Sequence, residues 1–119
     1  MLKEAKKALR VTVNNFDSEI AHLLMAGAND LEIAGVVLPG TVTFTIGTDD
    51  AVTDASTLKD DIAMRAIITY AQMRFGNPPN YDRLADAYDT QKVQLMHATG
   101  YTAYPEDPAD DDDQDGDGE

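Results

Sequence analysis

Residues 57–75 read TLKDDIAMRAIITYAQMRF, and this stretch decides the fold of the chain. Its apolar residues recur every three or four positions, which predicts a helix over about residues 57–75. A helix that is apolar over so much of its circumference is expected to be central to its domain. Thr57 followed by Asp60 predicts a capped start, and residues 76–79 predict a firm stop. The predicted apolar face consists of Leu58, Ile62, Ala63, Ala66, Ile67, Ile68, Tyr70 and Met73.

Before this segment, residues 17–34 predict another helix with one apolar stripe. The stripe consists of Ile20, Leu23, Leu24, Ala28 and Leu31. Asn15 or Asp17 can cap its start, and Gly35 can end it. Gly27 interrupts the helical pattern at a cost of about 1 kcal/mol relative to alanine. A close helix crossing would explain this glycine, and a local bend is the alternative.

Two more helices complete the prediction. Residues 80–99 predict a fourth helix, with Asn80 as its cap and Gly100 as its stop. One side of that helix carries Tyr81, Leu84, Ala85, Tyr88, Lys92 and Leu95. Residues 2–10 predict a short first helix, because its apolar residues share one side and its Lys and Arg residues take the other.

Residues 36–55 have no helical period. Residues 41–46 alternate polar and apolar side chains, which predicts a short strand bounded by turn signals. A loop of about 20 residues is long for a compact domain, and such loops are usually functional or mobile. We therefore expect an extended arm or a hairpin here, with Val42, Phe44 and Ile46 as candidate interface residues.

The predicted fold is all-α, with about four helices and the arm between the second and third. Residues 1–105 form one helical domain, large enough for one modest core. Residues 106–119 contain nine acidic residues and no basic one. This segment cannot bury enough apolar surface to offset its ordering entropy, so we expect a disordered acidic tail.

The formal net charge of −13 comes mostly from that tail. An acidic chain repels phosphates, which argues against tight binding to DNA or RNA. The chain has no cysteine, which excludes disulfides and thiolate metal sites. No apolar run approaches the ~18 residues that span a bilayer, and the first residues do not resemble a secretory signal. We expect a soluble protein that stays in the cytoplasm where it is made.

The sequence offers little catalytic chemistry. His22 and His97 are the only histidines, and neither has a partner at ligand spacing, so both are interpreted as structural. No nucleophile, zinc or nucleotide-binding motif occurs. The run from Asp111 to Asp115 imitates the first half of an EF-hand, without the glutamate at the twelfth position. We therefore predict no catalytic residue, no cofactor and no metal site.

Tyrosines gather in the last third of the chain. Tyrosine is amphipathic and enriched at protein interfaces. Tyr101 and Tyr104 favour an interface. For Tyr81 and Tyr88, an interface and an ordinary position at the edge of the core remain equally open.

The order of these segments resembles a known family. A short first helix leads through Leu9-Arg10-Val11 into Asp17-Ser18-Glu19-Ile20. After the second helix and the long loop come LKDDIAMRAIITY at residues 58–70 and YDTQKVQL at residues 88–95. Over about residues 1–104 the pattern resembles the head–tail connector (adaptor) proteins of long-tailed double-stranded DNA bacteriophages. The acidic tail is not part of this pattern.

The resemblance implies a non-enzymatic virion protein at the head–tail interface, assembled in the host cytoplasm. It implies a ring, expected to be a dodecamer, that binds the portal protein and extends the DNA channel. A downstream head-completion (stopper) or tail protein would dock on the ring. Genomic DNA would pass through without specific binding, because acidic residues repel its phosphates. The acidic tail is expected to splay outward or to meet a basic partner surface.

The alternative is a small acidic binding module, such as a DNA mimic or an inhibitor of a basic partner. Deleting residues 106–119 separates the two hypotheses. The deletion should leave a connector able to assemble, but it should cripple a charge mimic.

Overall fold

The computed structural model describes residues 1–76 and 78–98, and it is mostly helical. The elements are helices α1 (Leu2–Leu9), α2 (Asp17–Ile33), α3 (Asp61–Arg74) and α4 (Tyr81–His97), and strands β1 (Phe44–Ile46) and β2 (Val52–Asp54). The four predicted helices are confirmed. The all-α class is corrected, because β1 and β2 pair as a small antiparallel sheet. The predicted acidic tail, residues 106–119, lies outside the described residues.

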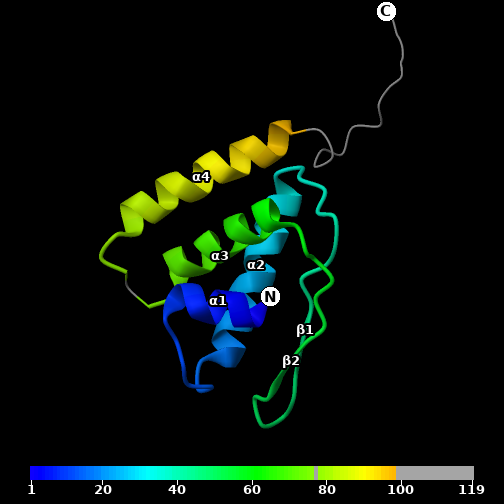
Figure 1. Cartoon of the computed structure of the whole chain (residues 1–119), viewed down its shortest axis with the longest axis vertical. Coiled ribbons are helices and arrows are strands. Elements are labelled where there is room, and N and C mark those ends of the chain that lie inside the picture. The colour runs from blue at the N-terminus through cyan, green and yellow to red at the C-terminus, as the bar shows by residue number, and fades with distance from the viewer. Residues whose placement is uncertain (77, 99–119) are drawn as a thin grey trace, which may run out of the picture.

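Helix α3 lies at the centre of the fold. It packs against α2 and α4, and α1 contacts both α2 and α3. In Figure 1, α4 runs along one side of α3, whereas α1 and α2 lie toward the other. The central position predicted from the apolar circumference of residues 57–75 is therefore confirmed.

The buried face of α3 differs from the predicted one at its first turn. Ala63, Ala66 and Ile67 are fully buried, as expected, but Ile62 is 57% exposed. Ile62 lies four residues before Ala66 and so shares its side of the helix. The predicted side of the helix is therefore correct for Ile62. Its side chain is exposed because it lies in the first turn, where no described neighbour covers it.

Asp60 caps α3, and Thr57 does not. The Asp60 Oδ2 atom accepts a hydrogen bond from the Ala63 amide at 2.9 Å, which satisfies one of the unpaired donors of the first turn. The helix therefore begins at Asp61, four residues later than predicted. Thr57 instead pairs with Thr41: its amide donates to the Thr41 carbonyl at 2.9 Å, and its Oγ1 accepts from the Thr41 amide at 2.8 Å.

Gly27 marks a close crossing of α2 and α3. A Cβ atom at this position would lie 3.0 Å from Tyr70 Cδ1 and 3.2 Å from Tyr70 Cβ. A larger side chain would push the helices apart, so the explanation by a close crossing is confirmed. The apolar stripe of α2 is confirmed as well, since Ile20, Leu24 and Leu31 are fully buried.

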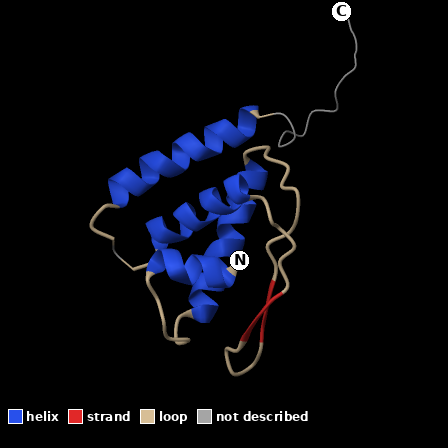
Figure 2. Cartoon of the chain, in the orientation of Figure 1, coloured by secondary structure: helices blue, strands red, loops and turns tan. Residues whose placement is uncertain are grey.

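The segment between α2 and α3 is a hairpin that lies beside α2 (Figure 2). Phe44 pairs with Asp54, and Ile46 pairs with Val52. Beyond the strands, hydrogen bonds continue to join the two legs: the Ala55 amide donates to the Thr43 carbonyl, and the Thr43 amide donates to Ser56 Oγ. We call residues 36–60 the arm. Of the two expected forms, arm or hairpin, the structure confirms the hairpin; its first strand is shorter than predicted, and the residues of its second strand were not predicted.

Candidate functional site

Helix α1 carries a concentration of positive charge. Four of the nine basic residues of the chain lie on or next to it. Its opposite side is held in the core by Ala5, which is fully buried, so the basic side chains occupy the outer side. They line a hollow of about 660 Å³, which we call the α1 groove. The groove is lined by Leu2, Lys3, Lys6, Lys7, Arg10, Val11, Thr12 and Asp54.

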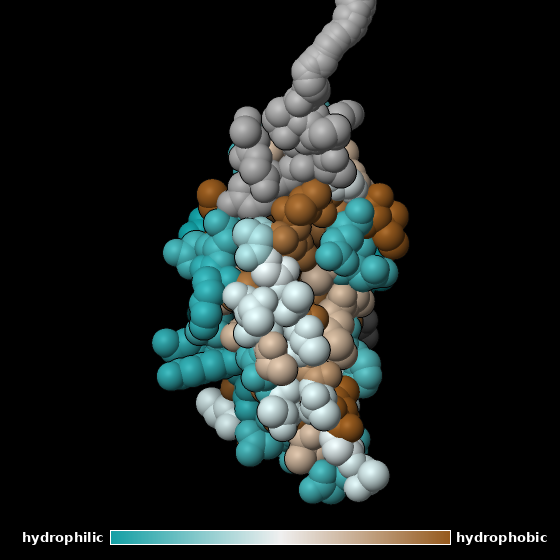
Figure 3. Space-filling view, turned by 90° about the vertical axis from the view of Figure 1, so that its right-hand side faces the viewer, coloured by the Kyte–Doolittle hydropathy of each residue, from teal (hydrophilic) through white to brown (hydrophobic). Residues whose placement is uncertain are grey.

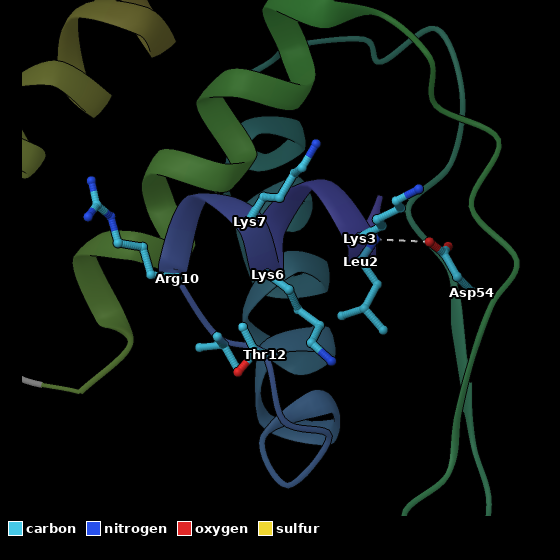
Figure 4. A pocket seen from close by; sticks show the side chains of 8 residues that line it. Leu2, Lys3, Lys6, Lys7, Arg10, Thr12 and Asp54 are labelled. Atoms are coloured by element: carbon cyan, nitrogen blue, oxygen red, sulfur yellow. Dashed lines mark hydrogen bonds between the residues drawn. The ribbon is translucent and has the colours of Figure 1, made fainter.

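Asp54 ties the groove to the arm. Its Oδ2 atom accepts a hydrogen bond from the Leu2 amide at 3.0 Å (Figure 4) and lies 3.0 Å from the Met1 ammonium nitrogen. Burial raises the pKa of Asp54, but hydrogen bonds from Leu2, Ser56 and the ammonium group outweigh this and lower it to about 2. The carboxylate is thus charged at neutral pH and joins α1 to the end of β2.

Lys6 has partners of its own. Its Nζ lies 2.8 Å from Asp17 Oδ1 and donates to Asn14 Oδ1 at 2.9 Å. Asp17 therefore pairs with α1 and does not cap α2, and neither does Asn15: the cap residue is Phe16, and it makes no side-chain capping hydrogen bond. Lys6 fixes the connection between the two helices.

The other basic residues of the groove lack such partners. Among residues 1–76 and 78–98, no carboxylate forms an ion pair with Lys3, Lys7 or Arg10. Lys3 has only a longer-range electrostatic interaction with Glu4. Figure 4 shows these side chains fanning out from α1 rather than converging on one point. The groove is therefore an extended cationic surface with an apolar floor.

Arg10 ends α1 in a left-handed conformation, with φ at 59° and ψ at 39°. Its amide donates to the Lys7 carbonyl at 3.2 Å, and the Val11 amide donates to the Lys6 carbonyl at 2.9 Å. Glycine is the usual residue in such a cap, because a Cβ atom costs roughly 1 kcal/mol in this region. Despite this cost, the position is occupied by Arg10, whose guanidinium lies at the rim of the α1 groove.

The opposite side of the molecule contains a satisfied polar cluster. Tyr88 donates to Asp30 Oδ2 at 2.5 Å, and Lys92 Nζ lies 3.3 Å from the same atom. The Tyr70 and Tyr88 rings meet edge to face with centroids 5.4 Å apart. Burial raises the pKa of Asp30, but hydrogen bonds from Tyr88 and Lys92 lower it overall. Burial and the bond to Asp30 raise the pKa of Tyr88.

The structure places the predicted interface residues in different settings. Phe44 and Tyr88 are buried within the chain, so their side chains already make internal contacts. Val42 and Ile46 are half-buried on the arm, and Tyr81 is 46% exposed. Tyr101 and Tyr104 lie outside the described residues. An interface role for all seven stays a prediction.

Exposed apolar side chains that the sequence analysis did not assign to an interface gather at one end. Ile33 is 78% exposed at the end of α2, and Val37 follows it. Ile62 lies in the first turn of α3, and Figure 1 places that turn beside the end of α2. In Figure 3 apolar surface appears toward the same end. We call Ile33, Val37 and Ile62 the apolar end.

Metal-ligating side chains do not cluster in the part of the chain that the structure describes. Over residues 1–76 and 78–98, no group of three or more His, Asp or Glu side chains could hold a metal ion. His22 lies 2.9 Å from the Ser18 carbonyl of its own helix, through Nδ1. None of the described helices is long and apolar enough to cross a membrane.

Sequence reasoning noted the basic side of the first helix but did not treat it as a site. The available signal was the spacing of Lys3, Lys7 and Arg10, which brings them to one side at helical period. Asp54 also lines the groove from more than forty positions away in the sequence, and no local pattern could place it beside α1.

Comparison with known proteins gives one result. A family model described as phage connector protein matches residues 1–102. No curated protein and no solved structure matches the chain.

Proposed function

The chain belongs to the phage connector protein family, and on this premise we propose that it forms a ring that joins the phage head to the tail. The ring, a dodecamer in this proposal, sits beneath the portal protein and extends the DNA channel. Its other side receives a head-completion (stopper) or tail protein. The observation that carries this proposal is the family match over residues 1–102, which includes every described element.

Two unlike surfaces support assembly of copies into a ring. The apolar end exposes Ile33, Val37 and Ile62, and the α1 groove exposes basic side chains. Contacts between different surfaces of identical subunits are head-to-tail, and they close into rings when the rotation fits. A helical body with surfaces of different chemistry is suited to such contacts.

The mild charge of the body supports passage of DNA. The net charge of −13 falls largely on residues 106–119, and acidic surfaces repel phosphates. DNA would therefore slide through without sticking. Binding to duplex DNA at low ionic strength tests this, and tight binding would contradict it.

Co-purification with the portal protein of the same phage tests the proposal directly. We expect ring density beneath the portal by electron cryomicroscopy, and either rings or portal-dependent assembly by light scattering. The Ile33→Asp, Ile62→Asp double variant should assemble poorly. The Thr48→Asp, Gln94→Asp variant adds the same charge at exposed positions and should assemble normally.

Deleting residues 106–119 distinguishes the connector from the alternative, an acidic binding module. Removing residues 106–119 should leave portal-dependent assembly detectable if the chain is a connector. Loss of all partner binding on that deletion, with no portal complex from the full chain, would favour a charge mimic and defeat the connector proposal.

A further inference from the structure

The α1 groove is a positively charged surface on a protein whose net charge is negative. Copies with a net charge of −13 repel each other, and this repulsion acts within about 10 Å at ordinary ionic strength. Local charge complementarity would therefore favour contact between copies. The α1 groove supplies the positive half, and residues 106–119 supply the negative half with nine acidic residues and no basic one.

We propose that the α1 groove is the docking site for the acidic segment 106–119 of a second copy of this chain. The inference rests on the proposed function, since it names a contact between neighbouring copies of the ring. Lys3, Lys7 and Arg10 would bind carboxylates, and Leu2 and Val11 would form the apolar floor beneath them.

The shape of the groove favours an extended polyanion over a single small anion. The basic side chains fan out along α1 (Figure 4), whereas a phosphate site needs donors that converge. The segment carries charge at intervals along its length, with Pro108 and Ala109 between two acidic runs. Those two small apolar residues suit the floor of the groove.

Arg10 supports the same conclusion independently. A glycine would relieve its left-handed backbone, with φ at 59°, yet the position holds an arginine whose guanidinium has no described carboxylate partner. Such strain is retained where the side chain is needed. An arginine fork binds carboxylates in two-point fashion, which glycine or lysine does not reproduce.

A second copy fits better than the same chain. In Figure 1, α4 ends near one end of the molecule, whereas α1 crosses the body away from it. The seven residues 99–105 can span at most about 25 Å, which limits how far from the end of α4 the acidic segment can begin. Docking there would also cover the cations that could otherwise hold DNA phosphates.

Photocrosslinking in the full chain tests the proposal. Gln114 is replaced by benzoylphenylalanine in unlabelled chains, which are mixed with ¹⁵N-labelled wild-type chains and illuminated. We expect mass spectrometry to find crosslinks on labelled peptides that span residues 2–12. Raising NaCl from about 50 to about 500 mM should reduce them severalfold, because salt screens exposed charges.

A matched pair of variants in the labelled chain identifies the residues. Lys3→Gln with Lys7→Gln and Arg10→Gln should lower the crosslink yield about fivefold or more, since charge pairing drives the contact. Lys59→Gln with Arg65→Gln and Arg83→Gln removes the same charge from exposed positions on other elements and should leave the yield within about twofold. Circular dichroism checks that both variants are folded.

Several results would overturn the inference. Crosslinks confined to the probe-bearing chain, crosslinks on another surface, or equal yields from both triple variants would each do so. Displacement of the segment by duplex DNA that binds wild type but not the first variant would make the groove a nucleic-acid site. A chain that assembles on the portal but crosslinks elsewhere defeats only this inference, whereas crosslinks at α1 without any portal complex defeat only the connector role.

Discussion

Different kinds of interaction hold the α2–α3–α4 block and the α1–arm region together. In the block, helices meet over small residues, and the hydroxyl of the buried Tyr88 donates to Asp30. In the α1–arm region, the contacts are mostly hydrogen bonds and ion pairs near the surface, and three basic side chains lack described carboxylate partners. The block is thus held mainly by packing between its helices, whereas the α1–arm region is held mainly by polar contacts and has basic side chains available to a partner.

This difference predicts unequal responses to substitution. Overpacking or unpairing a group in the block should lower the free energy of unfolding substantially. Changes in the α1–arm region should affect stability less. Four substitutions test this comparison.

Gly27→Val should have the largest effect. Its Cβ would start 3.0 Å from Tyr70, so α2 and α3 must separate, and we expect a loss of about 2–3 kcal/mol. Urea unfolding followed by circular dichroism measures it. Ala26→Val, on the exposed side of α2, should cost about 0.5 kcal/mol. If both variants lost the same free energy of unfolding, the close crossing at Gly27 would not explain the effect.

Tyr88→Phe should lower the free energy of unfolding by about 1–2 kcal/mol, because Asp30 loses its buried hydroxyl donor. The same urea experiment reports the change. Tyr81→Phe alters an exposed tyrosine and should change stability by less than about 0.5 kcal/mol. If Tyr88→Phe left the free energy of unfolding unchanged, the hydrogen bond to Asp30 would make no net contribution to stability.

Asp54→Asn should cost about 1 kcal/mol at neutral pH, because the carboxylate bonds the Leu2 amide near the surface. The folded-state pKa of about 2 lies below the ordinary value of 3.8. Its contribution is therefore complete above about pH 4 and is lost as pH falls toward 2. Thermal unfolding of the two proteins should converge over that interval.

Arg10→Gly should give the smallest change, and of opposite sign. Relief of the left-handed backbone should stabilise the chain by about 0.5 kcal/mol, while the crosslink yield at α1 falls. Calorimetry and the photocrosslinking experiment give the two values. A variant that is less stable would show that the arginine side chain supports the fold itself.

The sequence predicted the block better than the α1–arm region. Helical periodicity placed four helices, and the misfit of Gly27 left a close crossing or a local bend as its explanation, of which the structure supports the crossing. Those features follow from neighbours three or four positions apart. The start of α3 was missed because Asp60 and Thr57 both fit a cap, and only the pairing of Thr57 with Thr41 decides between them.

The candidate site was predictable only in part. The basic side of α1 is visible in the sequence, but Asp54 reaches it through the fold of the arm. The second strand of the hairpin could not be located in the sequence because residues 52–54 are too few to show an alternating pattern. Ile62 was assigned to the core because periodicity gives the side of a helix but not where its neighbours end.

The arm also has a mechanical consequence. A Cβ atom on Gly40 would lie 2.7 Å from Leu58 Cα, so the two legs touch backbone to backbone, and further bonds join Thr43 to Ala55 and Ser56. Legs joined along their length cannot slide past each other. A force applied at the tip of the arm would pass through Leu58 into the first turn of α3. A contact made by the arm would therefore be transmitted to the central helix.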